Sequence, residues 1–189
     1  MGDIVLHRRA NVTDVRTGHA EFRTERLLLR PFREDDRDEI VALHVDPATN
    51  RFNPHPPDEA VMNARFDGWL AGWAAGGLGY WAVTGAASGE LLGVGGLNPV
   101  EDEGERVLNL AYRFRPSAWG HGYATEVCRA ALAVAAARWP EVPVQAVVRD
   151  TNLPSIRVTE RLGLREHRRR TKDGVREILF RLPGAGVPG

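Results

Sequence analysis

The segment from Trp119 to Glu126 (WGHGYATE) contains the residue types that point most directly to chemistry. Gly120 and Gly122 lack side chains, so another molecule can approach the backbone closely there. An alanine-rich stretch that predicts a helix follows at once, and the first turn of a helix attracts phosphate through its unpaired N–H groups and its dipole. The segment therefore predicts an anion site suited to pyrophosphate. A plain glycine-containing turn has the same local pattern and is an equal alternative on spacing alone.

Other reactive side chains receive simpler interpretations. The segment has neither the G-x-G-x-x-G of dinucleotide-binding folds nor the Gly-Lys-Ser/Thr of a P-loop. The single cysteine, Cys128, lies inside the alanine-rich stretch with no histidine placed beside it, which favours a small core residue over a nucleophile. The run Arg168 to Arg170 would attract an acidic partner, but such runs more often form a solvated strand face. Four aromatic residues would suit an acceptor cleft but more often form core: Trp69, Trp73, Tyr80 and Trp81.

Composition limits the class of protein. The 189 residues predict one domain, and 25 basic residues balance 25 acidic ones, which disfavours a general nucleic-acid binder. One cysteine allows neither an intrachain disulfide nor a cysteine-rich zinc cluster, and no metal is expected. No segment has the roughly 20 apolar residues of a membrane span, and no signal core is evident. A cytoplasmic protein is the expectation.

Hydrophobic spacing predicts the elements that position the glycine segment. Strands are expected at Leu27–Leu29, Tyr80–Thr84, Leu91–Leu97, Val107–Phe114 and Val142–Val148, with a final hairpin over Leu164–Leu182 around Asp173-Gly174. Helices are expected from Glu34, over Met62–Trp73, over Tyr123–Trp139 and after the capping residue Asn152, ending at Gly163. Glu101, Asp102 and Glu103 are read as an acidic loop.

The resulting order is β-α-α-β-β-β-α-β-α-β-β, which predicts an α/β (mixed α+β) domain with a mixed sheet covered by helices. We expect a single domain over residues 22–182, a loosely ordered extension over residues 1–21 and a disordered tail over residues 183–189.

The segment Trp119–Glu126 resembles motif A of the GNAT N-acetyltransferases, whose loop reads Gln/Arg-x-x-Gly-x-Gly/Ala. Gly122 and Ala124 match its last glycine and small residue, and Trp119 in place of Gln or Arg is typical of the RimJ/RimL-like branch. Three further segments resemble that branch in the right order: Thr24–Phe32, Asn152–Ser155 and Arg161–Leu164. The resemblance covers about residues 22–182.

The resemblance implies a mostly antiparallel mixed sheet whose fourth and fifth strands, Val107–Phe114 and Val142–Val148, splay apart to hold acetyl-CoA. The pantetheine would pair with the first of these strands, the pyrophosphate would lie on the glycine segment, and Ser155 and Asn152 would act near the sulfur. Cofactor contacts are expected from Phe114, Arg115, Trp119, Gly120, His121, Gly122, Tyr123, Ala124, Thr125 and Asn152. For His121 and Ser155, an exposed loop residue and an ordinary first-turn residue are the plainer interpretations.

The general base and the acceptor stay open. The branch often has Glu in an Ala-Glu-x-Gly-Tyr pattern, where this chain has Asn109, and an amide cannot take a proton. Asp102, Glu103, His55 or a water chain would have to replace it. Near neutral pH an α-amine, with a reference pKa near ~8, needs less help than lysine near ~10.4. This favours a protein N-terminus or a small amine as acceptor. The alternative is a CoA-binding module with little or no catalysis. A homodimer would suit the branch.

Overall fold

The computed structural model describes residues 21–75 and 78–183. The predicted extension and tail lie almost wholly outside them and stay predictions. The described strands are Phe22–Arg23 (β1), Leu27–Arg30 (β2), Tyr80–Gly85 (β3), Leu91–Asp102 (β4), Glu105–Phe114 (β5), Val144–Arg149 (β6), Arg165–Lys172 (β7) and Val175–Arg181 (β8). The helices are Arg37–Val45 (α1), Glu59–Ala74 (α2), Tyr123–Arg138 (α3) and Leu153–Arg161 (α4), with short 3₁₀ turns at Glu34–Asp36 and Pro116–Ala118. The predicted order is confirmed, with β1 as an addition.

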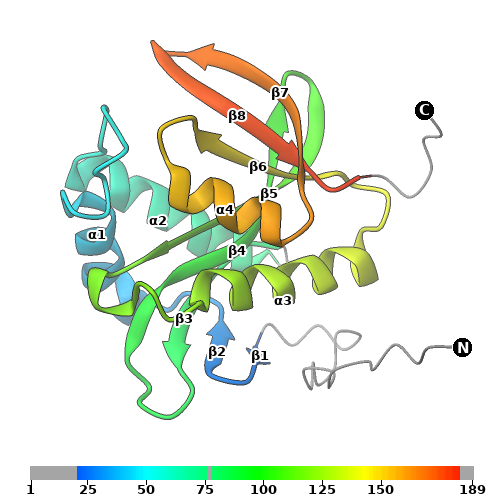
Figure 1. The fold of residues 1–189 in the computed structure, drawn as a ribbon. Coiled ribbons are helices and arrows are strands. Elements are labelled where there is room, and N and C mark those ends of the chain that lie inside the picture. The colour runs from blue at the N-terminus through cyan, green and yellow to red at the C-terminus, as the bar shows by residue number, and fades with distance from the viewer. Residues whose placement is uncertain (1–20, 76–77, 184–189) are drawn as a thin grey trace, which may run out of the picture.

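All strands belong to one sheet with the order β1-β2-β3-β4-β5-β6-β8-β7 (Figure 1). Every neighbouring pair is antiparallel except β5 and β6. These two pair in parallel at only two positions, Leu108 with Val144 and Asn109 with Gln145. Beyond Asn109 and Gln145, β5 and β6 no longer pair with each other, so the two strands splay apart. This confirms the expected fold class, with β5 and β6 as the predicted fourth and fifth strands.

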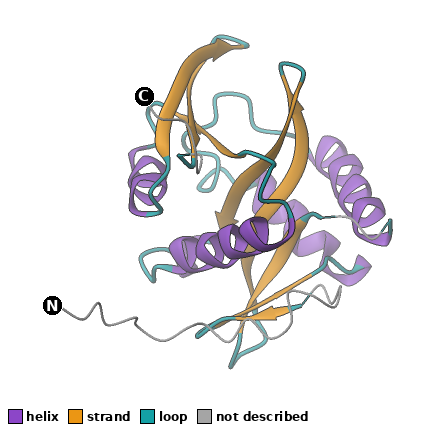
Figure 2. Cartoon of the chain, turned by 90° about the vertical axis from the view of Figure 1, so that its right-hand side faces the viewer, coloured by secondary structure: helices purple, strands orange, loops and turns teal. Residues whose placement is uncertain are grey.

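Helices cover both faces of the sheet (Figure 2). On one face, α3 buries Val127, Ala131 and Val134 in the larger core, to which α4 also contributes. On the other face, α1 and α2 bury Ile40 and Phe66 in a second cluster. The aromatic residues Trp69, Trp73, Tyr80 and Trp81 all pack into these two clusters, which confirms their interpretation as core.

Local signals place the elements around the site. The Asn152 side chain accepts a hydrogen bond from the Ser155 amide at 3.2 Å and so caps α4. Gly163 has a positive φ of 83° directly after that helix, as a left-handed C-terminal glycine should. Asp173 and Gly174 both have positive φ in the turn between β7 and β8, which fits a two-residue hairpin loop.

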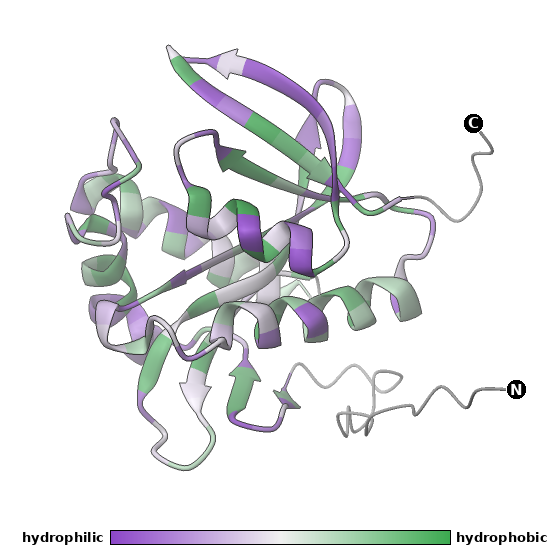
Figure 3. Cartoon of the chain, in the orientation of Figure 1, coloured by the Kyte–Doolittle hydropathy of each residue, from purple (hydrophilic) through white to green (hydrophobic). Residues whose placement is uncertain are grey.

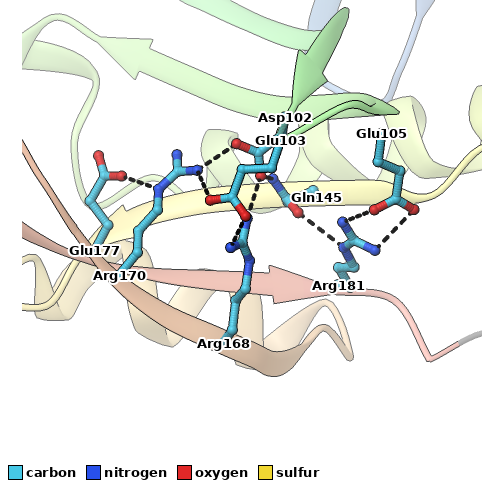
Figure 4. A network of polar contacts seen from close by, with 8 residues as sticks. All are labelled: Asp102, Glu103, Glu105, Gln145, Arg168, Arg170, Glu177 and Arg181. Atoms are coloured by element: carbon cyan, nitrogen blue, oxygen red, sulfur yellow. Dashed lines mark hydrogen bonds and ion pairs between the residues drawn. The ribbon is translucent and has the colours of Figure 1, made fainter.

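The predicted acidic loop was wrong. β4 continues to Asp102, and the chain reverses at Glu103 and Gly104, which both have positive φ. Asp102 lies in a network of side chains from five strands (Figure 4), where it accepts hydrogen bonds from Gln145, Arg168 and Arg170. Asp102 can lie in a strand and not in a solvated loop because arginines more than 60 residues later in the chain neutralise its charge.

The same network corrects the interpretation of the arginine run. Arg168 and Arg170 pair with Asp102 and Glu103, and Arg170 also pairs with Glu177. Only Arg169 is largely exposed, and it pairs with Glu166. The acidic partner of the run is therefore this chain's own β4–β5 turn. β7 is hydrophilic along most of its length (Figure 3), as suits an edge strand that must not pair with another chain.

The part of the chain that the structure describes has neither a membrane-spanning helix nor a cluster of metal ligands. No described helix is both long and apolar enough to span a bilayer. The described side chains also form no group of three or more His, Cys, Asp or Glu that would hold a metal ion.

Candidate active site

The splay between β5 and β6 opens into a cavity of about 570 Å³. Its walls come from the loop between α1 and α2, the diverging halves of β5 and β6, the glycine segment with the start of α3, and α4. Figure 1 shows α3 and α4 on the same side of the sheet, with the α1–α2 loop on the other. The cavity therefore reaches both faces through the gap between the strands.

The glycine segment forms one end of this cavity. Gly120 and Gly122 have φ of 79° and 78°, a left-handed conformation in which a side chain is strained. Gly122 is the N-terminal cap of α3 and offers no capping side chain, and the first helical hydrogen bond is donated by the Glu126 amide to the Gly122 carbonyl. The amides of Tyr123, Ala124 and Thr125 therefore have no partner within the helix. This is the geometry of an anion site.

Arg26 and Glu126 hold the glycine segment against the start of β2. Glu126 accepts hydrogen bonds from the Thr24 hydroxyl at 2.6 Å and from the Arg26 amide at 2.9 Å. The Arg26 guanidinium binds Glu126 and donates to the His121 carbonyl at 2.7 Å. Sequence reasoning included these residues in two separate motifs but gave them no role. Their contact explains why the two motifs occur together.

The diverging half of β5 presents backbone groups to the cavity. The Leu108 amide donates to Pro143 at the foot of β6, so residues two and four further on, Leu110 and Tyr112, also direct their backbone toward the gap. The Arg115 amide instead donates to Leu92 on the β4 side at 3.0 Å. The Phe114 carbonyl accepts from the Trp119 indole at 2.8 Å. Phe114 continues this alternation, and the pairing of Asn109 with Gln145 uses the Leu110 amide, so the free amides that face the gap are those of Tyr112 and Phe114.

Asn152, Ser155 and Tyr112 meet on the α4 side. Asn152 uses its side-chain oxygen for the helix cap, which leaves its side-chain nitrogen free. The Tyr112 hydroxyl donates to the Ser155 oxygen at 3.1 Å, so the Ser155 hydrogen is available for another acceptor. Burial raises the pKa of Tyr112 to about 12, which keeps its phenol protonated as this bond requires. Sequence reasoning missed Tyr112.

Most of the predicted site residues line the cavity: Phe114, Trp119, Gly120, Gly122, Tyr123, Ala124, Thr125, Asn152 and Ser155. Arg115 and His121 do not. Arg115 pairs with Glu39 and Glu90, and His121 is exposed and stacks on Tyr123. Cys128 contributes to the wall but is buried, and burial raises the pKa of its thiol to about 12. It is a core thiol, as predicted.

None of the predicted replacement bases lines the cavity. Asp102 and Glu103 are engaged with arginines, and hydrogen bonds from Gln145 and Arg170 outweigh burial and lower the pKa of Asp102 to about 2. His55 is exposed in the α1–α2 loop. Among the described residues, the cavity wall contains no Asp, Glu or His. Asn109 also lies outside it and donates to the Tyr80 hydroxyl at 2.6 Å.

Four arginines that sequence reasoning missed line the cavity: Arg51 and Arg161, which are exposed, and Arg113 and Arg149, which are partly buried. Arg113 comes from β5 and Arg149 from β6. Each is a single basic residue in a strand, and nothing in the local sequence distinguishes it from a surface arginine. Their shared position in the cavity wall is visible only in the folded chain, where β5 and β6 are neighbours in the sheet.

Comparison with known proteins agrees with this geometry. The profile of the acetyltransferase (GNAT) domain matches residues 26–165. A GNAT-family acetyltransferase structure from Bordetella pertussis is 24% identical with a TM-score of 0.74 and covers 86% of this chain and 99% of its own. An acetyltransferase from Agrobacterium tumefaciens is 25% identical with a TM-score of 0.72, over 86% and 94% of the two chains. A ribosomal-protein-S5-alanine acetyltransferase from Vibrio fischeri shares the fold at 13% identity, with a TM-score of 0.69 over 87% and 97%.

Among curated proteins, YkkB of Bacillus subtilis, whose function is uncharacterised, is 33% identical over 88 residues. The match spans about half the length of each chain, 47% of this one and 51% of YkkB. The domain match extends from Arg26, which helps to hold the glycine segment, to the start of β7, and so includes the whole cavity wall. The chain therefore belongs to the GNAT acetyltransferase family, in its RimJ/RimL-like branch.

Proposed function

We propose that this chain transfers an acetyl group from acetyl-CoA to a primary amine, either a protein N-terminal α-amine or a small amine. The observation that carries the proposal is the cavity between the splayed strands, which has unpaired helix amides at one end and a hydroxyl pair in its wall. Family membership supports acetyl-CoA as the donor.

The cofactor would lie along the α3 and α4 side of the gap. The amides of Tyr123, Ala124 and Thr125 would bind the pyrophosphate, which the left-handed glycines allow to approach. The pantetheine would take hydrogen bonds from the Phe114 amide and from the Asn152 side-chain nitrogen, which leaves the Tyr112 amide for the reacting carbonyl. Arg115 is not part of this contact, because its amide is already bonded to Leu92.

The chemistry needs no covalent enzyme intermediate. The neutral amine attacks the thioester carbonyl, the C–N bond forms, and the oxyanion of the tetrahedral intermediate accepts a hydrogen bond from a β5 amide such as that of Tyr112. The C–S bond then breaks, the amine loses its proton to solvent, and the thiolate leaves as CoA. Ser155 donates a hydrogen bond to the departing sulfur while it accepts one from Tyr112. The Ser155 hydroxyl is too weak an acid to transfer its proton to the thiolate, so it acts by hydrogen bonding.

The amine must lose its proton without a dedicated side chain. The described cavity wall has no carboxylate or imidazole, but it has the guanidinium groups of Arg113 and Arg149. A nearby positive charge disfavours an ammonium ion and so lowers the pKa of a bound amine. Together with the neutral Asn109 outside the cavity, this supports an acceptor whose amine is less basic than a lysine side chain, such as an α-amine.

Calorimetry with CoA and turnover of acetyl-CoA test the proposal together. We expect CoA to bind and, at about 100 times its dissociation constant, to stabilise the fold by roughly 2.7 kcal/mol. We expect kcat/KM to rise with pH along the titration of each acceptor amine, so that two acceptors of different pKa give two different midpoints. A shared midpoint near pH 6 would instead reveal a base in the protein. CoA binding without turnover on any amine would support a non-catalytic CoA-binding module.

A further inference from the structure

Arg113 and Arg149 differ from every other arginine that the structure describes. Both are partly buried, and neither has a carboxylate within ion-pair distance among the described residues. The other described arginines without a carboxylate partner are exposed. All other described arginines of similar burial form ion pairs: Arg30, Arg37, Arg115, Arg168, Arg170 and Arg181.

The two unpaired cations are costly to the folded chain. Removing a guanidinium from water without a counter-charge costs several kcal/mol in typical proteins. Burial lowers the pKa of both groups, that of Arg113 to about 10, and repulsion from Arg149 and Arg65 adds to the shift at Arg113. Both remain charged near neutral pH. Asp46 and Glu177 oppose these shifts only from a distance, so the partly buried part of the cavity wall keeps two uncompensated positive charges.

Neutral oxygens orient these arginines but leave donors free. Arg113 uses one nitrogen, Nη1, for the Thr49 carbonyl at 3.1 Å, the Thr49 hydroxyl at 2.8 Å and the Asn50 side chain at 3.1 Å. Arg149 donates Nη2 to Asn53 at 2.6 Å, while its Nε is fully buried without a hydrogen-bond partner. Buried donors are nearly always paired in folded proteins. Arg113 Nη2 and Arg149 Nη1 also have no hydrogen-bond partner among the described residues, so these donors can serve an acceptor oxygen of a bound molecule.

We propose that Arg113 and Arg149 bind a carboxylate of the acceptor, which makes the acceptor an amino acid or another small amine with its own carboxylate. Planar guanidinium groups match the two oxygens of a carboxylate. The proposal rests on the proposed acetyl transfer and names its substrate class.

The cofactor's phosphates are a poorer match for this pair. Successive side chains of a strand point to opposite faces, and Tyr112 and Phe114 face the α3 side where the phosphate-binding amides lie. Arg113 faces the α1–α2 loop instead, through its bonds to Thr49 and Asn50. An acceptor that enters from this side meets the arginines, while the cofactor occupies the other side.

Matched acceptors provide the first test. Amino acids and their primary amides are compared as acceptors near pH 7, with acetyl-CoA saturating. The carboxylate raises the pKa of the neighbouring amine, so an enzyme that ignores it should prefer the amides. We expect the acids to have at least roughly tenfold higher kcat/KM, as charged hydrogen bonds of this type provide. Amides that react as well as or better than the acids would overturn the proposal.

Variants assign the effect to the arginines. Arg113→Gln and Arg149→Gln should each raise KM for the carboxylate acceptor at least roughly tenfold and leave KM for acetyl-CoA within about twofold. Arg106→Gln is the matched control, because Arg106 lies on the same strand, is exposed and is outside the cavity wall. Arg113→Gln also removes the hydrogen bonds to Thr49 and Asn50 in the α1–α2 loop. If that variant fails to fold, KM for the carboxylate acceptor in Arg149→Gln alone tests the proposal.

Calorimetry separates this proposal from the proposed function. Amino acids and their amides are titrated into the protein saturated with CoA, and the wild type should bind the acids and not the amides. Arg149→Gln should lose that binding. Acetyl transfer with equal use of acids and amides would refute the carboxylate site and leave the function intact. Binding of acids by the arginines without any turnover would refute the function and leave the site intact.

Discussion

At the scale of single residues, the proposed site would rely on backbone amides where many enzymes use side chains. The unpaired amides at the start of α3 exist because Gly122 caps the helix without a side chain. The amides of Tyr112 and Phe114 are free because β6 turns away after Gln145. The residues at these positions therefore matter mainly because they leave backbone amides without a hydrogen-bond partner.

Substitutions at Gly122 test the anion site. A Cβ at this position would lie 3.6 Å from Arg26 Nη2, so the folded chain has room for a side chain. Asn tolerates the left-handed conformation far better than Val. We expect Gly122→Asn to keep the loop and weaken CoA binding at least roughly tenfold by collision with the pyrophosphate. Gly122→Val should add loop strain and weaken binding further.

Ser155→Ala is the contrasting variant, measured by calorimetry and steady-state kinetics. Loss of a hydrogen bond to the departing thiolate should lower kcat roughly tenfold or more with little change in CoA affinity.

Wild-type CoA affinity in both Gly122 variants would show that the glycine segment does not bind the cofactor.

At the scale of elements, the charged network joins the β4–β5 turn to the β7–β8 hairpin (Figure 4). Gln145 is fully buried and bridges the two sides, since it donates to Asp102 and accepts from Arg181. The network lies at the closed end of the β5–β6 gap, where the two strands still pair. It therefore fixes the point from which the strands diverge.

We expect Asp102→Asn to lower the free energy of unfolding by about 1–3 kcal/mol, because Gln145 and two arginines lose one of the two acceptor oxygens and the negative charge that they share. CoA affinity should change little, since Asp102 is outside the cavity wall. The control is Glu103→Gln, whose carboxylate is largely exposed and should contribute within about 0.5 kcal/mol. Equal effects of the two substitutions in urea unfolding would show that the network does not hold the hairpins together.

The elements also show what sequence could and could not predict. Asn152, Gly163 and Asp173-Gly174 act on their immediate neighbours, so their capping and turn roles were predictable. The glycine segment was predictable for the same reason. Asp102 was wrongly assigned to a loop because its partners come from β7. Arg113 and Arg149 were missed because their shared position in one cavity wall depends on β5 and β6 being neighbours in the sheet. Neither fact is present in any local pattern.

At the scale of the whole molecule, the helical layer of α1 and α2 meets the cavity side of β5 around His44. Its ring packs against Trp69 of α2, and its backbone carbonyl accepts a hydrogen bond from Asn50, which also binds Arg113. His44 Nδ1 lies 2.8 Å from the Ile40 carbonyl, which fits a neutral ring with its hydrogen on Nδ1. One neutral histidine thus lies between a helix pair and a charged cavity wall.

This position makes the stability of the whole chain depend on pH. Burial lowers the pKa of His44 from 6.5 to about 4, and repulsion from Arg113 adds to the shift. Between these two values the unfolded chain binds a proton that the folded chain does not, so the free energy of unfolding falls as pH decreases from about 6.5 toward about 4. At about 1.4 kcal/mol per pH unit, the loss of unfolding free energy is at most about 3.5 kcal/mol.

Denaturant unfolding of the wild type and of His44→Gln at several pH values measures this contribution. Gln does not titrate, so the difference between the two curves isolates His44 from the carboxylates with lowered pKa, such as Asp36 and Glu126, whose contribution is lost at lower pH. We expect the variant to be less stable at pH 7.5, where packing against Trp69 is lost, and the gap to narrow steadily down to pH 4.5. Parallel curves would mean that His44 gains its proton as easily in the folded chain as in the unfolded one, and the α1–α2 layer would then be more open to water than this packing implies.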